Sequence, residues 1–187
     1  DASSPQAGRK LLVLVHGLCM SDRQWTRAGH DHGHALARDL GCTPLYLQYN
    51  SGRHVSDNGR EFAEMLEQLL AHWPQPVDEL LILGHSMGGL VARSACHHAE
   101  GHGHAWLQRL TKLVFLGTPH HGAPLERGGN RLDYLMELSP YVAPFTSLGK
   151  ARSAGITSLR YGSITAKEDE FVPLPDDVEC YALAATL

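Results

Sequence analysis

Residues 79–96 read Glu-Leu-Leu-Ile-Leu-Gly-His-Ser-Met-Gly-Gly-Leu-Val-Ala-Arg-Ser-Ala-Cys, and this stretch decides the fold. Its first five residues are a short apolar run typical of a buried parallel strand, and the residues from Gly89 onward favour a helix rich in small side chains. Between them, residues 84–88 form the pattern Gly-x-Ser-x-Gly. A strand, a sharp turn and a helix around this pattern predict a nucleophile elbow with Ser86 as the nucleophile. A chance match is the alternative, and the flanking strand and helix disfavour it.

The elbow predicts a specific backbone geometry around the serine. A strained conformation lifts the Ser86 hydroxyl clear of the sheet edge, and glycines on both sides let the strand and the helix pack closely. The following helix directs unpaired N–H groups toward the place where an oxyanion would form. The N–H group of Met87, the residue after the nucleophile, is therefore the first predicted donor of an oxyanion hole.

A second apolar run, Lys10–Val15, ends in His16-Gly17-Leu18. The loop after such a strand supplies the other oxyanion donor in this arrangement, and glycine lets the backbone approach the substrate without a side chain in the way. The N–H group of Leu18 is the predicted second donor. In isolation the His-Gly pair would indicate an ordinary strand-ending turn, but its position about 70 residues before an elbow favours the oxyanion loop.

Four segments together resemble the α/β-hydrolase superfamily, specifically bacterial lipases and esterases similar to GPI inositol-deacylase-like proteins. The segments are residues 13–18, 47–52, 84–89 and 116–122, the last of which contains Gly-Thr-Pro-His. They cover most of residues 11–125, and residues 126–177 resemble the family less clearly. The resemblance implies an α/β fold, a mostly parallel sheet with helices on both faces, and a carboxylic-ester hydrolase of lipid metabolism that acts through an acyl-enzyme on Ser86 without a cofactor.

The resemblance also implies which other residues lie near the substrate: His16, Gly17, His85, Pro119 and His120. Two alternatives to an ester hydrolase stay open. One is a serine acyltransferase or thioesterase with the same machinery, and the other is a non-catalytic pseudoenzyme or binding module that keeps only the fold.

A triad needs a histidine to take the proton of the serine and a carboxylate to orient that histidine. The chain order in this fold is Ser, Asp/Glu, His, and the acid normally follows the strand that corresponds here to residues 179–185. Both partners are therefore expected downstream of Leu187, the fold is expected to be truncated at its C-terminus, and residues 1–187 alone are expected to be nearly inactive. Thirteen histidines make a substitute base conceivable. The candidates near the serine are His16, His85, His120 and His121.

The composition of the chain restricts its domain organisation and the classes of molecule that it can bind. The length of 187 residues and 43% hydrophobic residues predict one α/β-hydrolase domain with a substantial core. A net charge of −4 and the lack of a Lys/Arg run argue against nucleic acid. No apolar stretch approaches the roughly 20 residues that cross a bilayer. The expected partner is a small-molecule or lipid ester, with peripheral lipid contact compatible with that substrate.

The cysteine and histidine patterns favour neither disulfides nor a metal site. Cys19, Cys42, Cys96 and Cys180 form no Cys-x-x-Cys pair, so free thiols, at least two of them buried, and a reducing, cytoplasmic compartment are favoured. His-rich tracts can bind metal. The histidines of residues 97–104 lack a convergent ligand pattern, so a solvated helix end is favoured and no metal is expected.

The remaining elements alternate as in an α/β protein. Residues 1–9 are expected to be a flexible leader, residues 28–40, 59–73 and the stretch up to about 98 to be helical, and residues 11–15, 45–49, 112–117 and 179–185 to be strands. The apolar stripe Phe62, Met65, Leu66, Leu69, Leu70 and Trp73 is expected to cover the sheet. Residues 123–177 break the alternation and predict a cap or insertion, whose apolar residues 134–145 form either an acyl-binding wall or a satellite core.

Overall fold

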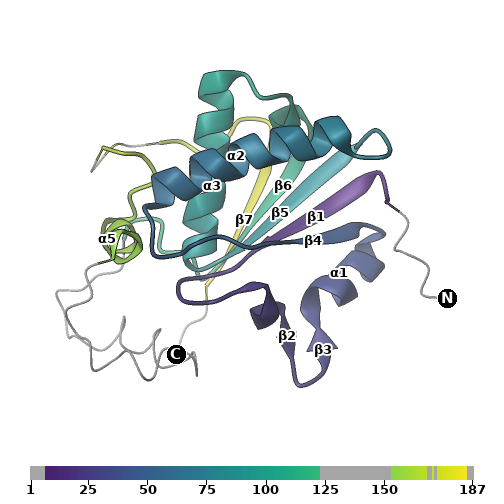
Figure 1. Ribbon diagram of the computed structural model, residues 1–187, viewed down its shortest axis with the longest axis horizontal. Coiled ribbons are helices and arrows are strands. Elements are labelled where there is room, and N and C mark those ends of the chain that lie inside the picture. The colour runs from purple at the N-terminus through teal and green to yellow at the C-terminus, as the bar shows by residue number, and fades with distance from the viewer. Residues whose placement is uncertain (1–6, 123–152, 168–169, 171, 185–187) are drawn as a thin grey trace.

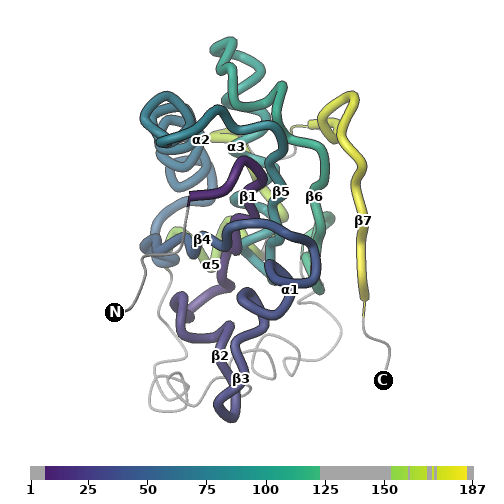
Figure 2. Tube along the Cα trace, turned by 90° about the vertical axis from the view of Figure 1, so that its right-hand side faces the viewer, coloured from purple at the N-terminus to yellow at the C-terminus, as the bar shows by residue number. Residues whose placement is uncertain are grey.

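The computed structural model describes residues 7–122, 153–167, 170 and 172–184, and these residues contain a five-stranded parallel sheet of order β4-β1-β5-β6-β7 (Figure 1). The edge strands β4 and β7 lie far apart (Figure 2). The strands are β1 (Lys10–Val15), β4 (Thr43–Leu47), β5 (Glu79–His85), β6 (Leu110–Leu116) and β7 (Glu179–Leu183). Parallel neighbours joined by helical crossovers place all five carboxyl ends at one edge, where ligands bind in such sheets.

Helices cover both faces of the sheet. Helices α2 (Val55–His72) and α3 (Met87–His102) lie side by side on one face (Figure 1). Helix α1 (His32–Leu40) packs on the other face, where a Cβ atom at Gly33 would lie 2.5 Å from the Tyr46 hydroxyl of β4. The parallel sheet with helices on both faces confirms the fold class that the sequence predicts. The shorter helices are η1 (Asp22–Trp25), η2 (Ala105–Arg109) and α5 (Ala154–Tyr161), of which α5 packs against α2.

The alternation of side chains along β5 divides the core in two. Leu80 and Ile82 are fully buried against α2 and α3, whereas Leu81 and Leu83 belong to a smaller cluster with Trp25 on the face of α1. Successive strand residues point to opposite faces, so both faces of β5 are apolar, as a central parallel strand requires.

Helix α2 approaches α3 closely because a glycine lies at their contact. A Cβ atom at Gly59 would lie 2.4 Å from the Cβ atom of Ser94 and 3.0 Å from the backbone nitrogen of Ala95. The buried face of α2 runs through Val55, Asn58, Gly59, Phe62, Ala63 and Leu66. The helix therefore starts four residues before the expected Gly59. The predicted apolar stripe is wrong at Met65, whose side chain is 45% exposed. The buried face of the helix includes Ala63 instead.

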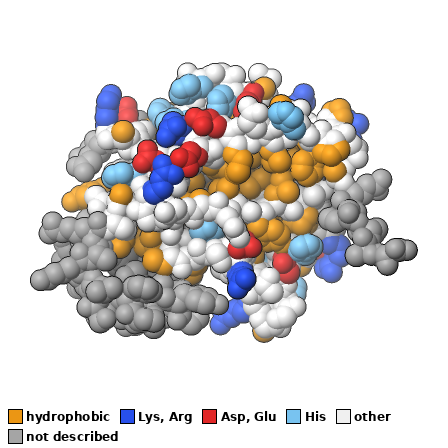
Figure 3. All heavy atoms as spheres, viewed as in Figure 1, with side chains coloured by type: hydrophobic (Ala, Val, Ile, Leu, Met, Phe, Trp, Pro, Cys, Tyr) orange, Lys and Arg blue, Asp and Glu red, His pale blue; other side chains and the backbone are white. Residues whose placement is uncertain are grey.

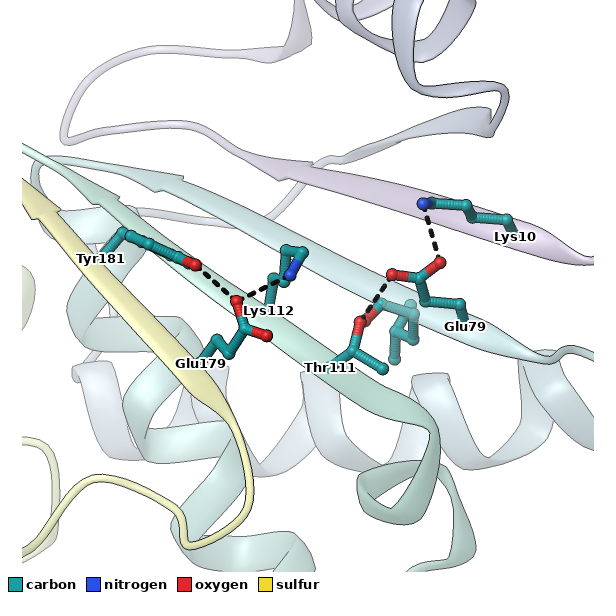
Figure 4. A network of polar contacts seen from close by, with 7 residues as sticks. Lys10, Glu79, Thr111, Lys112, Glu179 and Tyr181 are labelled. Atoms are coloured by element: carbon teal, nitrogen blue, oxygen red, sulfur yellow. Dashed lines mark hydrogen bonds and ion pairs between the residues drawn. The ribbon is translucent and has the colours of Figure 1, made fainter.

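Charged side chains lie on the surface in mixed pairs. Arg53 and Glu61 are 2.8 Å apart, and Arg60 and Glu64 are 3.6 Å apart, near the outer side of α2, where Figure 3 shows basic and acidic side chains next to each other. A second network joins the amino ends of β1, β5, β6 and β7 (Figure 4). It consists of Lys10–Glu79 at 2.7 Å, Thr111–Glu79 at 3.0 Å, Lys112–Glu179 at 2.7 Å and the Tyr181 hydroxyl on Glu179. This network lies at the edge of the sheet opposite to the one where ligands bind.

The predicted leader and insertion are described only in part. Trp73 Nε1 donates to the Gly8 carbonyl at 2.8 Å, and the Gly8 N–H group donates to Thr43 Oγ1 at 3.0 Å. Residues 1–6 of the predicted leader and residues 123–152 of the predicted insertion, including its apolar residues 134–145, lie outside the described residues.

Candidate active site

Ser86 lies at the sharp turn between β5 and α3, with φ +52° and ψ −122°. Positive φ is rare for a residue with a side chain and stores on the order of 1–3 kcal/mol of strain. The N–H group of Ser86 donates to the Leu116 carbonyl at 2.8 Å and the Gly89 N–H group donates to the Ser86 carbonyl at 3.1 Å, so both sides of the turn are held. Ser86 is 7% exposed, at the carboxyl edge of the sheet.

Three glycines make this turn sterically possible. A Cβ atom at Gly84 would lie 2.6 Å from the Gly89 Cα atom, and one at Gly88 would lie 2.4 Å from the Val15 carbonyl oxygen. A Cβ atom at Gly89 would lie 2.1 Å from Thr118 Oγ1. Real Cβ atoms do not approach so closely, so the elbow, β1 and the loop after β6 can meet only where side chains are absent.

The strain at Ser86 predicts a difference between two variants that both lack the hydroxyl. Glycine accepts positive φ without a steric penalty, whereas alanine does not. We expect Ser86→Gly to be more stable than Ser86→Ala by about 1 kcal/mol in chemical denaturation. Equal stability of the two variants would show that the backbone of the turn is not strained.

The predicted oxyanion loop packs directly against the nucleophile. A Cβ atom at Gly17 would lie 3.3 Å from the Ser86 Cβ atom and 3.1 Å from His85 Nδ1. Met87 is the first residue of α3, so its N–H group has no acceptor within the helix. The fold therefore brings the Gly17–Leu18 segment and the start of α3 to the two sides of Ser86.

His16 is buried, at 1% exposure, and its polar atoms contact other protein groups. Nδ1 lies 2.9 Å from the Gly17 carbonyl oxygen, and the ring stacks on Tyr49 with 4.3 Å between centroids. Nε2 lies 3.5 Å from the Tyr49 N–H nitrogen. Burial lowers the pKa of His16, so the ring is neutral at neutral pH. Both ring nitrogens of His16 therefore face protein groups, and its assignment near the substrate stays a prediction.

The other histidines near the elbow differ in their surroundings. The imidazole of His85 extends to the face of α1, where it lies T-shaped to the Trp25 ring with 6.5 Å between the ring centroids, and burial lowers its pKa. His120 receives a hydrogen bond at Nδ1 from Arg93 at 3.2 Å, which places its proton on Nε2, and burial lowers its pKa as well. Among the described residues, no histidine is hydrogen-bonded to the Ser86 hydroxyl. None of the four candidate bases His16, His85, His120 and the exposed His121 is hydrogen-bonded to Ser86 in this structure.

A cavity of about 490 Å³ lies on the α1 face beside the elbow. Its walls include Trp25, Leu36, Leu83, His85 and Leu116, so it borders the carboxyl ends of β5 and β6. Apolar walls with a few polar groups are typical of small-molecule sites.

The family model described as the PGAP1-like alpha/beta domain matches residues 6–165, which is more than half of the chain. The chain belongs to this family. The match confirms the resemblance to the α/β-hydrolase superfamily that the four sequence segments indicate. No curated protein matches the sequence.

Solved structures similar to this PGAP1-like domain are named as lipases, esterases and thioesterases. A lipase from Bacillus licheniformis in its mature form is 20% identical over 86% of this chain and 58% of its own, with a TM-score of 0.57. A metagenomic carboxyl esterase is 17% identical over 95% of this chain and 50% of its own, with a TM-score of 0.58. A thioesterase of the prodiginine pathway of Streptomyces coelicolor is 18% identical over 97% of this chain and 75% of its own, with a TM-score of 0.54. At these identities the likeness is one of fold, and the chain spans about half the length of the lipase and the esterase.

Arg93 of α3 binds two loops of the PGAP1-like domain, the loop after β6 and the segment before β7. Its guanidinium donates to His120 at 3.2 Å and to the Val172 carbonyl at 2.6 Å. Burial lowers the pKa of Arg93. The loop after β6, with Pro119 and His120, is thereby held near Ser86. The sequence patterns assign no role to Arg93 or to Tyr49, although Tyr49 lies within residues 47–52, which resemble the family.

The thiols of the protein agree with the sequence prediction in part. The four cysteines are free thiols, but only Cys96 is fully buried, while Cys42 and Cys180 are half-buried and Cys19 is exposed. The described residues contain no group of three or more His, Cys, Asp or Glu side chains that could hold a metal ion. Within the same part of the chain, none of the helices combines the length and apolarity that crossing a membrane requires. Of the four histidines expected in a solvated helix end, His102 is exposed, whereas His97, His98 and His104 are half-buried.

Proposed function

We propose that this domain hydrolyses carboxylic esters through an acyl-enzyme on Ser86, with a small-molecule or lipid ester as substrate. The observation that carries the proposal is the backbone of Ser86, held at φ +52° between a buried strand and the start of a long helix, with Gly17 packed against it. A strained serine at the carboxyl edge of a parallel sheet is the arrangement that catalysis by this fold uses.

The proposed chemistry has two halves. Ser86 Oγ attacks the ester carbonyl while a histidine takes its proton, and the N–H groups of Leu18 and Met87 donate to the oxyanion of the tetrahedral intermediate. Collapse of the intermediate expels the alcohol, which receives the proton from the same histidine. Water then attacks the acyl-enzyme by the same route and releases the acid. We propose that the histidine and its carboxylate partner belong to a part of the full-length protein other than the described residues.

The proposal is tested by turnover of the full-length protein on a panel of p-nitrophenyl esters of increasing acyl length, with a matched thioester beside each ester. An initial burst of p-nitrophenol followed by slower turnover is expected if the acyl-enzyme accumulates. Faster turnover of thioesters would favour the thioesterase alternative. Release of alcohol only when an acceptor alcohol is added would favour the acyltransferase, and absence of all turnover would favour the non-catalytic module.

Because backbone groups form the proposed oxyanion hole, a substitution of Gly17 should lower activity more than substitutions of the Leu18 and Met87 side chains. In Gly17→Val the new Cβ atom would lie 3.1 Å from His85 Nδ1 and 3.3 Å from the Ser86 Cβ atom, with two methyl groups beyond it. We expect kcat/KM to fall by about a hundredfold or more, comparable to loss of an oxyanion donor.

Leu18→Met and Met87→Leu are the matched controls, because they change the side chains and keep the backbone donors. Both should stay within about tenfold of the wild-type kcat. Full activity of a folded Gly17→Val variant would show that the loop after β1 is not the oxyanion loop.

A further inference from the structure

The two peptide groups on either side of Gly17 contain four polar groups, and three of them are already bound within the protein. The His16 carbonyl accepts a hydrogen bond from the Tyr49 hydroxyl at 2.7 Å, and the Gly17 N–H group donates to Gln24 Oε1 at 3.2 Å. The Gly17 carbonyl accepts a hydrogen bond from His16 Nδ1 at 2.9 Å. The fourth group is the Leu18 N–H, which has no hydrogen-bond acceptor among the described residues.

These contacts determine the direction of the Leu18 N–H group. In a trans peptide the carbonyl and the N–H group point in opposite directions. The Gly17 carbonyl and the Leu18 N–H group belong to one peptide, so a carbonyl held toward the His16 ring directs the N–H group away from that ring. The preceding peptide is held at both ends, by Tyr49 and Gln24, so the loop cannot rotate as a unit without breaking a hydrogen bond.

The hydrogen-bonding partners also determine the tautomer of His16. A carbonyl oxygen can only accept, so the nitrogen that contacts it, Nδ1, carries the proton. In a neutral ring Nε2 then has a lone pair, and it faces the Tyr49 N–H group. The stacked Tyr49 ring, with planes 16° apart, keeps the imidazole in this orientation.

We propose that Tyr49, His16 and Gln24 are positioning residues that hold the Gly17–Leu18 peptide with its N–H group directed at the oxyanion of the reaction on Ser86. The inference rests on the proposed function and goes beyond it, because it assigns the alignment of one oxyanion donor to the contacts of three side chains with the loop backbone. Tyr49 follows the edge strand β4 and Gln24 lies in the short helix η1, so elements on both sides of the loop contribute.

Tyr49→Phe tests the proposal, because it removes one hydroxyl and keeps the ring that stacks on His16. In the full-length protein we expect kcat for an activated ester to fall about tenfold with KM within about twofold, since a misaligned donor weakens binding of the transition state more than that of the ester. The affinity of a trifluoromethyl ketone inhibitor, which forms an oxyanion on the serine, should weaken by the same factor as kcat/KM.

Tyr46→Phe is the matched control. Tyr46 lies in β4 three residues earlier and its hydroxyl donates to Asp31 at 2.5 Å, away from the loop. This variant should lose stability without a change in kcat. Gln24→Met removes the other bond to the same peptide, so its effect on kcat should be less than additive with that of Tyr49→Phe. His16→Asn keeps a donor near the position of Nδ1 and should retain more activity than His16→Ala.

Nuclear magnetic resonance provides a readout that does not need turnover. The ¹⁵N shifts of His16 should show the Nδ1–H tautomer, and Tyr49→Phe should shift the Leu18 amide resonance and accelerate its hydrogen exchange, while Tyr46→Phe should leave both unchanged. If the wild-type protein shows no Ser86-dependent turnover, the proposed function is wrong and the resonances alone decide the inference. The inference is overturned if kcat is unchanged in Tyr49→Phe. It is also overturned if the Leu18 amide resonance and its hydrogen exchange are unchanged in that variant, or if His16 of the wild-type protein is the Nε2–H tautomer.

Discussion

Replacement of Ser86 by alanine is expected to abolish ester hydrolysis by the full-length protein, with a loss of several orders of magnitude in kcat. The hydroxyl is the only group of the side chain that can form the acyl-enzyme, and alanine keeps the Cβ atom of the serine. The variant should therefore bind substrate-like inhibitors and keep its fold while it loses turnover.

Initial rates on the most rapidly cleaved ester, with the far-ultraviolet circular dichroism of both proteins, check this result. Ser94→Ala is a useful control, since Ser94 lies on the same helix but is fully buried and donates to the Ile164 carbonyl at 2.6 Å. That variant should lose stability and keep turnover. Hydrolysis that survives in Ser86→Ala would contradict the assignment of the nucleophile.

Gly88→Ala is expected to have the largest effect on stability of any methyl-sized change in the elbow. The new Cβ atom would lie 2.4 Å from the Val15 carbonyl oxygen and 2.5 Å from the His16 carbonyl oxygen. Both oxygens belong to the backbone at the end of a central strand, so neither can rotate away as a side chain would. We expect a loss of about 3 kcal/mol or more in the free energy of unfolding, at the upper end of the effects of overpacking, and a loss of activity.

Gly101→Ala is the matched control for Gly88→Ala, because it makes the same change in the same helix. No atom lies within 4 Å of a Cβ position at Gly101, so alanine should stabilise the domain by about 0.5–1 kcal/mol through its helix propensity. Urea denaturation of the two variants beside the wild-type protein measures both effects. Equal effects of the two substitutions would show that α3 does not pack on β1 as described.

The sequence predicted the central part of the fold because local and tertiary preferences agree there. Strands β1 and β5 are apolar on both faces, which is the pattern of a buried parallel strand, and the turn at Ser86 needs glycines that the motif contains. The order of the His-Gly loop, the elbow and the Gly-Thr-Pro-His loop then placed these three segments at one edge of the sheet.

The errors lie where tertiary contacts decide the local structure. The strand predicted for residues 45–49 is β4, Thr43–Leu47, which includes Pro44 because an edge strand pairs on one side only. Residues 28–40 were expected to be helical throughout, but β2 (Thr26–Arg27) and β3 (His30–Asp31) form a hairpin. Its turn has positive φ at Ala28 and Gly29, and alanine is not among the residues that signal such a turn.

The parts of the site that sequence reasoning missed consist of contacts between distant segments. The Tyr49 hydroxyl reaches the His16 carbonyl across 33 positions of the chain, and Arg93 reaches Val172 across 79. Neither residue belongs to a motif with a fixed spacing. Two indications in the sequence were that Tyr49 ends the strand predicted for residues 45–49, which places it at the carboxyl edge of a parallel sheet, and that it lies in residues 47–52, which resemble the family.

Trapping the nucleophile with a covalent reagent and locating the adduct tests the assignment of Ser86. The full-length protein is treated with a fluorophosphonate, digested, and its peptides are sequenced by tandem mass spectrometry, with Ser86→Ala treated in parallel. We expect one phosphonate adduct, on Ser86 in the peptide that spans the β5–α3 turn, and none in the variant. An adduct on another residue together with intact ester turnover, or equal labelling of the variant, would contradict the assignment.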